Sequence, residues 1–190
     1  MFCKVRQKSI EELAKTNILP QTTFWGRIKR EQGFIPKGFE ITISKDVLID
    51  SAESNVLKGE DILVLIKYVD TEDCIAYVPY GPKMEPMFEN QGVFLEQLSE
   101  AIRPYLPANC MFIRYDLPWE NQWAEEDSYF DQNGNWMGPP ETKIQEYRVN
   151  FKTYKWNLHK STGDFLPKNT FFLDLNLSED DLLMNMRFNN

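Results

Sequence analysis

The chain has a single histidine and three cysteines among its 190 residues. His159 is not accompanied by a GxSxG motif, a nucleophilic-cysteine motif or a second histidine, so we expect neither a triad hydrolase nor an HExxH metal enzyme. The cysteines are widely spaced and form no CxxC pair, which argues against a disulfide framework and a zinc site. A P-loop and a dinucleotide-binding glycine motif are also missing. The sequence therefore predicts no metal and no cofactor.

Long apolar runs are missing as well. No run approaches the roughly 20 residues that span a bilayer, and the amino-terminal MFCKVRQKSIEELAK lacks the apolar core of a signal peptide. The cytoplasm is therefore the expected compartment. With 42% hydrophobic and 14% aromatic residues, the chain can bury a core of its own.

Positive charge is scarce outside the first part of the chain. The net charge is −8, yet residues 1–45 carry nine Lys or Arg against four Asp or Glu, and the remainder carries twelve against twenty-five. Sequence-independent binding to nucleic acid needs many phosphate contacts at once, which an acidic protein disfavours. The basic part suits one anionic group better, although a solvated face without any ligand stays open.

What the chain does contain is a compact basic and aromatic segment at residues 21–34, QTTFWGRIKREQGF. It predicts a helix that Thr22 or Thr23 caps at the amino end and that Gly33 ends. Trp25 and Lys29 are four residues apart and share one helical face. Lys29 is then either a lysine whose stem covers apolar surface at the rim of the core or a cation directed at an anionic ligand.

The rest of the chain alternates between helical and extended patterns. We expect short helix 9–15 with a capping box, helix 93–106 interrupted by Pro104, and strands at 36–44, 61–69, 74–84 and 110–119, the third broken at Pro79 and the last ended by Pro118. This alternation predicts an α/β fold.

Residues 119–165 are less regular. Asn133 and Gly134 predict a hairpin turn, and the alternation of apolar residues at 147–158 predicts a strand. His159 is expected on the surface of a strand or hairpin. Residues 170–188 predict a strand followed by a helix with Ser178 as its N-cap.

Four segments in a fixed order resemble the FemABX family, the aminoacyltransferases that build the interpeptide bridges of peptidoglycan. They read QTTFWGRIK, YVPYGPKMEP, FIRYDLPW and LPKNTFFLDLNLSEDDLLMNM. The positions that match the family pattern are Gln21, Trp25, Lys29, Tyr77, Gly81, Pro82, Arg114, Asp116, Pro167, Asp174, Leu175 and Met186.

The resemblance implies an acyl-CoA N-acyltransferase (GNAT)-like fold, a mixed and largely antiparallel sheet flanked by helices. Residues 1–165 would form one GNAT-like domain, the precursor-binding half, and residues 166–190 the first strand and helix of a truncated second GNAT-like domain. The basic segment that follows in full-length members is not present after Asn190. We expect the final strand and helix to pack on the first domain or on a second copy of the chain, which would make it a homo-oligomer.

The resemblance also implies a reaction, the transfer of an amino acid from aminoacyl-tRNA to the stem peptide of a peptidoglycan precursor, either UDP-MurNAc-peptide or a lipid-linked form. Lys29 would contact the phosphates of the precursor, since phosphate oxygens accept charge-assisted bonds. Trp25, Tyr77 and Arg114 would line the substrate cleft. Which amino acid is transferred does not follow from the residues.

Three of the matched positions have a second interpretation that is equally open. Gly81 and Pro82 would let the backbone approach the ligand, or they form a plain turn. Asp116 would accept a proton from the attacking amine or orient it, or it pairs with Arg114 or caps the turn before Pro118.

Two other functions stay open beside the aminoacyltransferase. One is a noncatalytic binding module with a GNAT-like shell. The other is a small-molecule N-acetyltransferase that uses acetyl-CoA, which the lack of a Gly-rich pyrophosphate loop disfavours.

Overall fold

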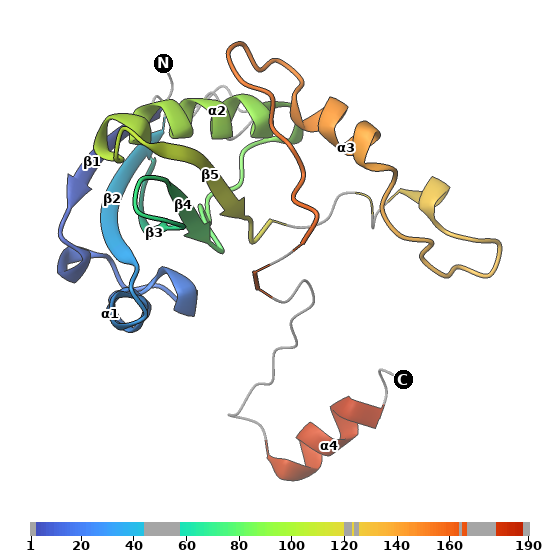
Figure 1. The fold of residues 1–190 in the computed structure, drawn as a ribbon. Coiled ribbons are helices and arrows are strands. Elements are labelled where there is room, and N and C mark those ends of the chain that lie inside the picture. Colours follow the sequence, from blue (N-terminus) through green and yellow to red (C-terminus); the bar gives the residue numbers. More distant parts are fainter. Residues whose placement is uncertain are drawn as a thin grey trace.

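The computed structural model describes residues 3–43, 58–119, 123, 126–163, 165–166 and 178–187. Within these residues five strands form one sheet, and their order in the sheet is their order in the chain (Figure 1). The pairs from β1 to β4 are antiparallel, and β5 is parallel to β4. The strands are β1 (Cys3–Lys8), β2 (Ile35–Ile43), β3 (Lys58–Tyr68), β4 (Cys74–Pro79) and β5 (Cys110–Asp116).

Helices cover both faces of this sheet. Helix α2 lies across one face and connects β4 to β5, while α1 lies against the other face (Figure 1). The helices are α1 (Thr23–Glu31), α2 (Gln91–Ile102), α3 (Thr142–Val149) and α4 (Glu179–Arg187). Short 3-10 turns are η1 (Ile10–Glu12), η2 (Leu19–Gln21), η4 (Phe88–Asn90), η5 (Arg103–Tyr105) and η7 (Asp127–Tyr129). The predicted α/β class, with a mixed and largely antiparallel sheet flanked by helices, is confirmed.

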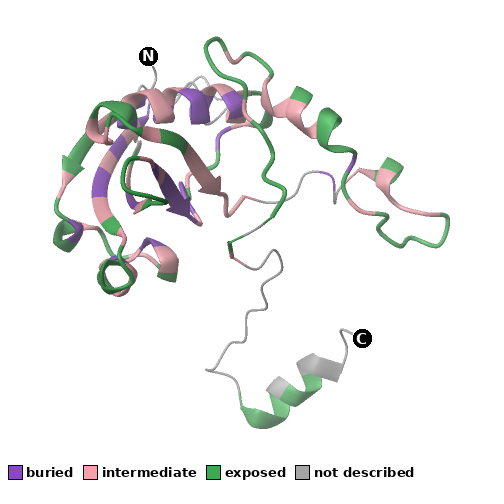
Figure 2. Ribbon diagram, in the orientation of Figure 1, coloured by how far each residue is buried: buried purple, intermediate pink, exposed green. Residues whose placement is uncertain are grey.

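The alternation of side chains along β3 divides the core between the two faces. Ile62 and Val64 face α2, and Leu63 and Leu65 face α1. Figure 2 shows the buried residues on the strands and on the inner side of α2. The α2 side is the larger cluster, with Cys3, Phe39, Ile41, Ile43, Ile62, Val64, Ala76, Val78, Phe94, Leu95, Leu98 and Ile102 all buried.

The buried side chain of Gln21 connects the start of α1 to the middle of the sheet. The register between β3 and β4 ends at Leu65 and Tyr77. Beyond this pair the Gln21 amide bridges the two strands. Its Oε1 accepts the N–H of Leu63 at 2.7 Å, and its Nε2 donates to the Pro79 carbonyl at 2.5 Å. These bonds fix where α1 begins.

Most of the predicted elements are confirmed. Thr22 caps α1 by accepting the N–H of Trp25 at 3.2 Å, and Gly33 follows the helix with φ of +79°. Helix α2 ends at Ile102, just before the turn that contains Pro104. The strands at 36–44, 61–69, 74–84 and 110–119 are present, the third ending at Pro79 as predicted.

The turn at Gly134 and the cap of the last helix are also present. Gly134 has φ of +80°, and a bridge joins Phe130 to Trp136 across the turn. Ser178 Oγ accepts the N–H of Asp181 at 3.2 Å at the start of α4. The strand predicted ahead of this helix, at 170–176, lies outside the described residues.

The strand predicted at 147–158 is wrong. Residues up to Val149 belong to α3, and the following backbone is bonded to a side chain of α2 in place of a strand. The buried carboxylate of Glu96 accepts the N–H groups of residues 154–156. Helix α3 approaches α2 closely, since a Cβ at Gly92 would lie 1.6 Å from the Val149 carbonyl oxygen. His159 accordingly lies on an irregular, exposed segment and not on a strand.

Two other differences concern the first 15 residues. The predicted helix 9–15 is only the turn η1, although its capping box between Ser9 and Glu12 is present. The chain leaves the helical path because the N–H of Ala14 donates to the Asp61 carboxylate at 2.6 Å. Strand β1 was not predicted, because it is short, polar and buries Cys3 alone.

No helix in the described part of the chain is long and apolar enough to cross a bilayer.

The role of Gln21 predicts a large effect of a small change. Gln21→Leu keeps the volume but leaves the Leu63 N–H and the Pro79 carbonyl buried without a partner. We expect urea unfolding to give a free energy of unfolding lower by about 2 to 4 kcal/mol. The exposed Gln7 of β1 is the control, since Gln7→Leu should change it by less than about 0.5 kcal/mol. Equal effects of the two substitutions would show that the amide bridge contributes little.

Candidate functional site

The register of β4 and β5 brings three of the predicted residues together on the face that α1 covers. Tyr77 pairs with Arg114, and Pro79 pairs with Asp116. Alternate residues of a strand share a face, so Tyr77, Arg114 and Asp116 all lie on this side of the sheet. We call this surface, together with the inner side of α1, the α1 face.

A hydrogen-bonded cluster joins these three side chains. The Tyr77 hydroxyl donates to Asp116 Oδ2 at 2.7 Å, and Arg114 Nε donates to Asp116 Oδ1 at 3.0 Å. The Arg114 and Asp116 side chains are only 12% and 13% exposed, so solvent screens this ion pair weakly. The predicted alternative in which Asp116 pairs with Arg114 is therefore present. Its use as a proton acceptor stays a prediction.

Ser161, Gly163 and Phe165 lie against this cluster and contact the Arg114 guanidinium. Nη1 donates to Ser161 Oγ at 2.8 Å, and Nη2 donates to the Gly163 carbonyl at 2.6 Å. The Phe165 ring lies 4.0 Å from the guanidinium carbon and packs edge-on against Tyr77 at 5.2 Å. Arg114 thus holds a distant part of the chain against the sheet, and this contact cannot be inferred from the strand pattern.

Burial and a neighbouring charge set the ionisation of Tyr77. Loss of solvent raises the pKa of its hydroxyl well above the usual value, and the hydrogen bond to the Asp116 carboxylate raises the pKa further. The tyrosine is therefore a firmly protonated donor, which keeps Asp116 oriented.

The turn after β4 is built around Gly81. A Cβ there would lie 2.8 Å from Gln21 Nε2, so the position needs glycine for the approach of a side chain of this protein. The Gly81 N–H donates to the Asp116 carbonyl at 3.1 Å, and the carbonyl of Pro82 accepts the Trp119 indole N–H at 3.0 Å. The predicted approach of Gly81 and Pro82 to a ligand stays a prediction.

Trp25 and Lys29 lie on one face of α1, as the spacing predicts. Lys29 Nζ is 5.0 Å from the centre of the Trp25 ring, and the ring packs against the same apolar cluster as Tyr77. The Trp25 indole Nε1 is buried and finds no hydrogen-bond partner in the part of the chain that the structure describes. The two residues are therefore at the edge of the α1 face.

Lys67 and Phe34 also belong to this surface, and the sequence analysis missed both. Lys67 Nζ lies 5.0 Å from the centre of the Phe34 ring, and Lys29 Nζ lies 5.5 Å from it. Lys67 is two residues beyond Leu65 on β3 and so faces the same side of the sheet. The sequence feature that could have indicated Lys67 is a lysine at an α1-facing position directly after the apolar run of β3.

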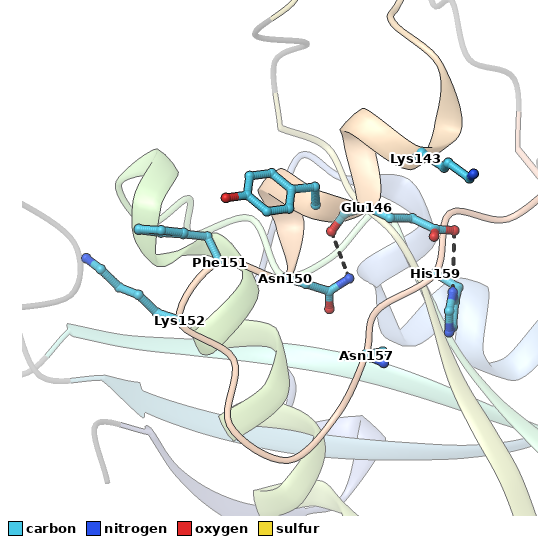
Figure 3. A pocket seen from close by; sticks show the side chains of 8 residues that line it. Lys143, Glu146, Asn150, Phe151, Lys152, Asn157 and His159 are labelled. Atoms are coloured by element: carbon cyan, nitrogen blue, oxygen red, sulfur yellow. Dashed lines mark hydrogen bonds and ion pairs between the residues drawn. The ribbon is translucent and has the colours of Figure 1, made fainter.

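A hollow lies away from this surface, between α3 and the segment that follows it (Figure 3). Its volume is about 400 Å³, and Glu146 reaches across it to His159, with Oε1 and Nδ1 3.4 Å apart. The side chains that line it are Lys143, Glu146, Tyr147, Asn150, Phe151, Lys152, Asn157 and His159. All come from one local stretch, and none is a predicted site residue.

Comparisons of the chain with protein-family models, with curated proteins and with solved structures find no match. The geometry of the chain itself places Tyr77, Arg114 and Asp116 in one cluster and Trp25 and Lys29 at the edge of the same face.

The raised pKa of Tyr77 predicts a loss of stability in alkali. The folded protein holds this proton more tightly than the unfolded chain, so the stabilisation is complete below about pH 10 and falls as the pH rises further. Tyr77→Phe removes the titrating group. Above pH 10 the gap in unfolding free energy between wild type and Tyr77→Phe should shrink by up to about 1.4 kcal/mol per pH unit.

Urea unfolding at a series of pH values measures this gap. Tyr68→Phe, at an exposed tyrosine of β3, is the matched control. A gap that stays constant above pH 10 would mean that burial does not hold the Tyr77 proton.

Proposed function

We propose that this chain is the precursor-binding half of an aminoacyltransferase that resembles the FemABX family and has a GNAT-like fold. In this proposal it binds a peptidoglycan precursor, UDP-MurNAc-peptide or a lipid-linked form, and presents the amine of its stem peptide to aminoacyl-tRNA. The observation that carries the proposal is the gathering of residues from three segments far apart in the chain, at 21–34, 77–82 and 114–116, on one face of the sheet.

The fold class gives further support. The resemblance implies a mixed, largely antiparallel sheet flanked by helices, and this chain has such a sheet with a helical connection before its parallel strand. A shared class is a weak argument for function by itself. The position of the matched residues on one face of the sheet is the more specific support for the proposal.

Lys29 is proposed to contact the phosphates of the precursor. Its ammonium group lies at the edge of the α1 face, with one described hydrogen bond, to Gln32 Oε1 at 2.9 Å. An ammonium has three donors, so two remain for phosphate oxygens. Such charge-assisted bonds are stronger than neutral ones and tolerate several geometries.

Asp116 is proposed to orient the attacking amine. Each of its oxygens accepts one bond within the cluster, which leaves further lone pairs for an ammonium or amine of the stem peptide. In the reaction the amine nitrogen would attack the ester carbonyl of aminoacyl-tRNA and form the new amide, and the ribose oxygen would leave as a hydroxyl group with the proton that the amine loses. The ester is already activated, so holding the reactants in place could supply much of the rate.

A noncatalytic binding module is the second candidate, and one observation favours it. Arg114 and Asp116 are both engaged within the protein, so the described cluster contains no unpaired carboxylate that is poised as a strong base. A transfer assay with charged tRNA and precursor separates the two candidates, since only an aminoacyltransferase forms the new amide bond.

Calorimetry with UDP-MurNAc-pentapeptide tests the proposed function directly. We expect measurable binding, and we expect Lys29→Ala to weaken it by about tenfold to a hundredfold, because a charge-assisted contact is lost. Arg30→Ala is the matched control, since it removes one positive charge from the next position of α1 and lies about 100° around the helix. It should bind almost as wild type does.

Two results would contradict the proposed function. One is the absence of binding by a folded wild-type protein. The other is an equal loss of affinity in Lys29→Ala and Arg30→Ala, which would reduce the interaction to general electrostatic attraction.

A further inference from the structure

Two lysines from different elements converge on one aromatic ring at the end of α1. Lys29 Nζ and Lys67 Nζ lie 5.5 Å and 5.0 Å from the centre of the Phe34 ring. The two Nζ atoms can therefore lie no further apart than the sum of these two distances. Both also bind Gln32, Lys29 through the side-chain Oε1 at 2.9 Å and Lys67 through the main-chain carbonyl at 3.2 Å. The helix end thus holds two ammonium groups that share one aromatic ring and one glutamine.

Gly33 makes this convergence possible. Its φ of +79° ends the helix in the left-handed conformation, which turns the chain so that Phe34 packs back against the α1 face. A Cβ at this position would also lie 3.2 Å from Lys67 Nζ. The glycine therefore sets the turn and leaves room for the Lys67 ammonium to reach the Gln32 carbonyl.

The charge of this pair is not neutralised within the described residues. Neither Nζ lies within 4 Å of a carboxylate in that part of the chain, in contrast to Lys8 with Asp61 and Arg114 with Asp116. Each ammonium has three donors and makes one described hydrogen bond to the protein. Like charges repel, so a site of this kind favours an anion that contacts both groups.

Capping of the helix end explains only part of this arrangement. A cation near the last carbonyls of α1 interacts favourably with the helix dipole, and Lys67 does bind the Gln32 carbonyl. Lys29, however, binds the side chain of Gln32 and not a main-chain carbonyl. A second cation on the same ring adds repulsion to any capping benefit, unless an anion lies between the two.

We propose that Lys67 completes a two-lysine anion site with Lys29, and that this site binds two linked phosphate groups. Phe34 holds both ammonium groups through its ring, and the free donors of each contact one phosphate of a diphosphate. Lys67 is two residues beyond Leu65 on β3, and Leu65 pairs with Tyr77, so the site is next to Tyr77 on the α1 face. This inference rests on the proposed function only for the identity of the natural ligand, a precursor that carries a diphosphate.

Calorimetry with inorganic pyrophosphate and inorganic phosphate at one fixed, low ionic strength tests the site. Pyrophosphate should bind more tightly than phosphate, because it can span both lysines. Lys29→Ala and Lys67→Ala should each weaken pyrophosphate binding by about tenfold or more. The difference between pyrophosphate and phosphate should shrink in both variants. Lys4→Ala, at an exposed position of β1, is the control for loss of one strand lysine and should bind as wild type.

A substitution that keeps the positive charge distinguishes a ligand-binding role of Lys67 from a purely structural one. Lys67→Arg keeps the positive charge and should retain most of the affinity for pyrophosphate, and thermal unfolding verifies that each variant is folded. Wild-type affinity in a folded Lys67→Ala protein overturns the inference, as does the absence of pyrophosphate binding by the wild type.

The inference and the proposed function fail in different ways. If pyrophosphate binding requires both lysines but UDP-MurNAc-pentapeptide binds no more tightly than pyrophosphate, the anion site stands and the proposed function fails. If the muramyl peptide nucleotide binds through Lys29 and is indifferent to Lys67→Ala, the proposed function stands and the two-lysine site is overturned.

Discussion

The buried amide of Gln21 is the interaction on which the rest of the α1 face depends. Beyond the last pair of β3 and β4, Gln21 joins the two strands by bonding to the Leu63 N–H and the Pro79 carbonyl. Gly81 must lack a side chain because the same amide fills the space beside it. One residue thereby fixes the beginning of α1, the end of β4 and the turn whose Gly81 N–H donates to the Asp116 carbonyl. A buried polar group with every bond made gives this part of the core a single arrangement.

Two periodicities then place the side chains of the candidate site. The two-residue period of the strands puts Lys67, Tyr77, Arg114 and Asp116 on one face, and the helical period of α1 puts Trp25 and Lys29 beside them. These side chains differ in whether their charges are paired within the protein. Asp116 and Arg114 form an ion pair beneath Ser161 and Gly163, whereas Lys29 and Lys67 at the end of α1 have no carboxylate partner among the described residues. An acidic protein thus has a local cationic site, and this suits one small anion better than a polyanion.

The sequence predicts this fold well wherever the pattern is local. The cap at Thr22, the stop at Gly33, the buried run of β3 and the breaks at Pro79 and Pro118 all follow from the chemistry of single residues. The prediction from sequence fails where the carboxylate of a distant residue accepts backbone N–H groups. Glu96 does so for residues 154–156, and Asp61 does so for Ala14. The pairing of Arg114 with Asp116 could be predicted from strand alternation, whereas the bond from Tyr77 to Asp116 depends on the parallel register of β4 and β5. The pairing of Lys67 with Lys29 could not, because it depends on the register between β2 and β3 and on the turn at Gly33.

The central claim is that the α1 face binds the ligand, with the lysine pair at one end and the Tyr77 cluster further along. Backbone amide chemical shifts, recorded while UDP-MurNAc-pentapeptide is added, test this claim most directly. The account predicts that the largest changes fall at the end of α1, at Phe34, at Lys67 and around Tyr77. Changes confined to α2, α3 or the hollow beside His159, or no change at all, would contradict it.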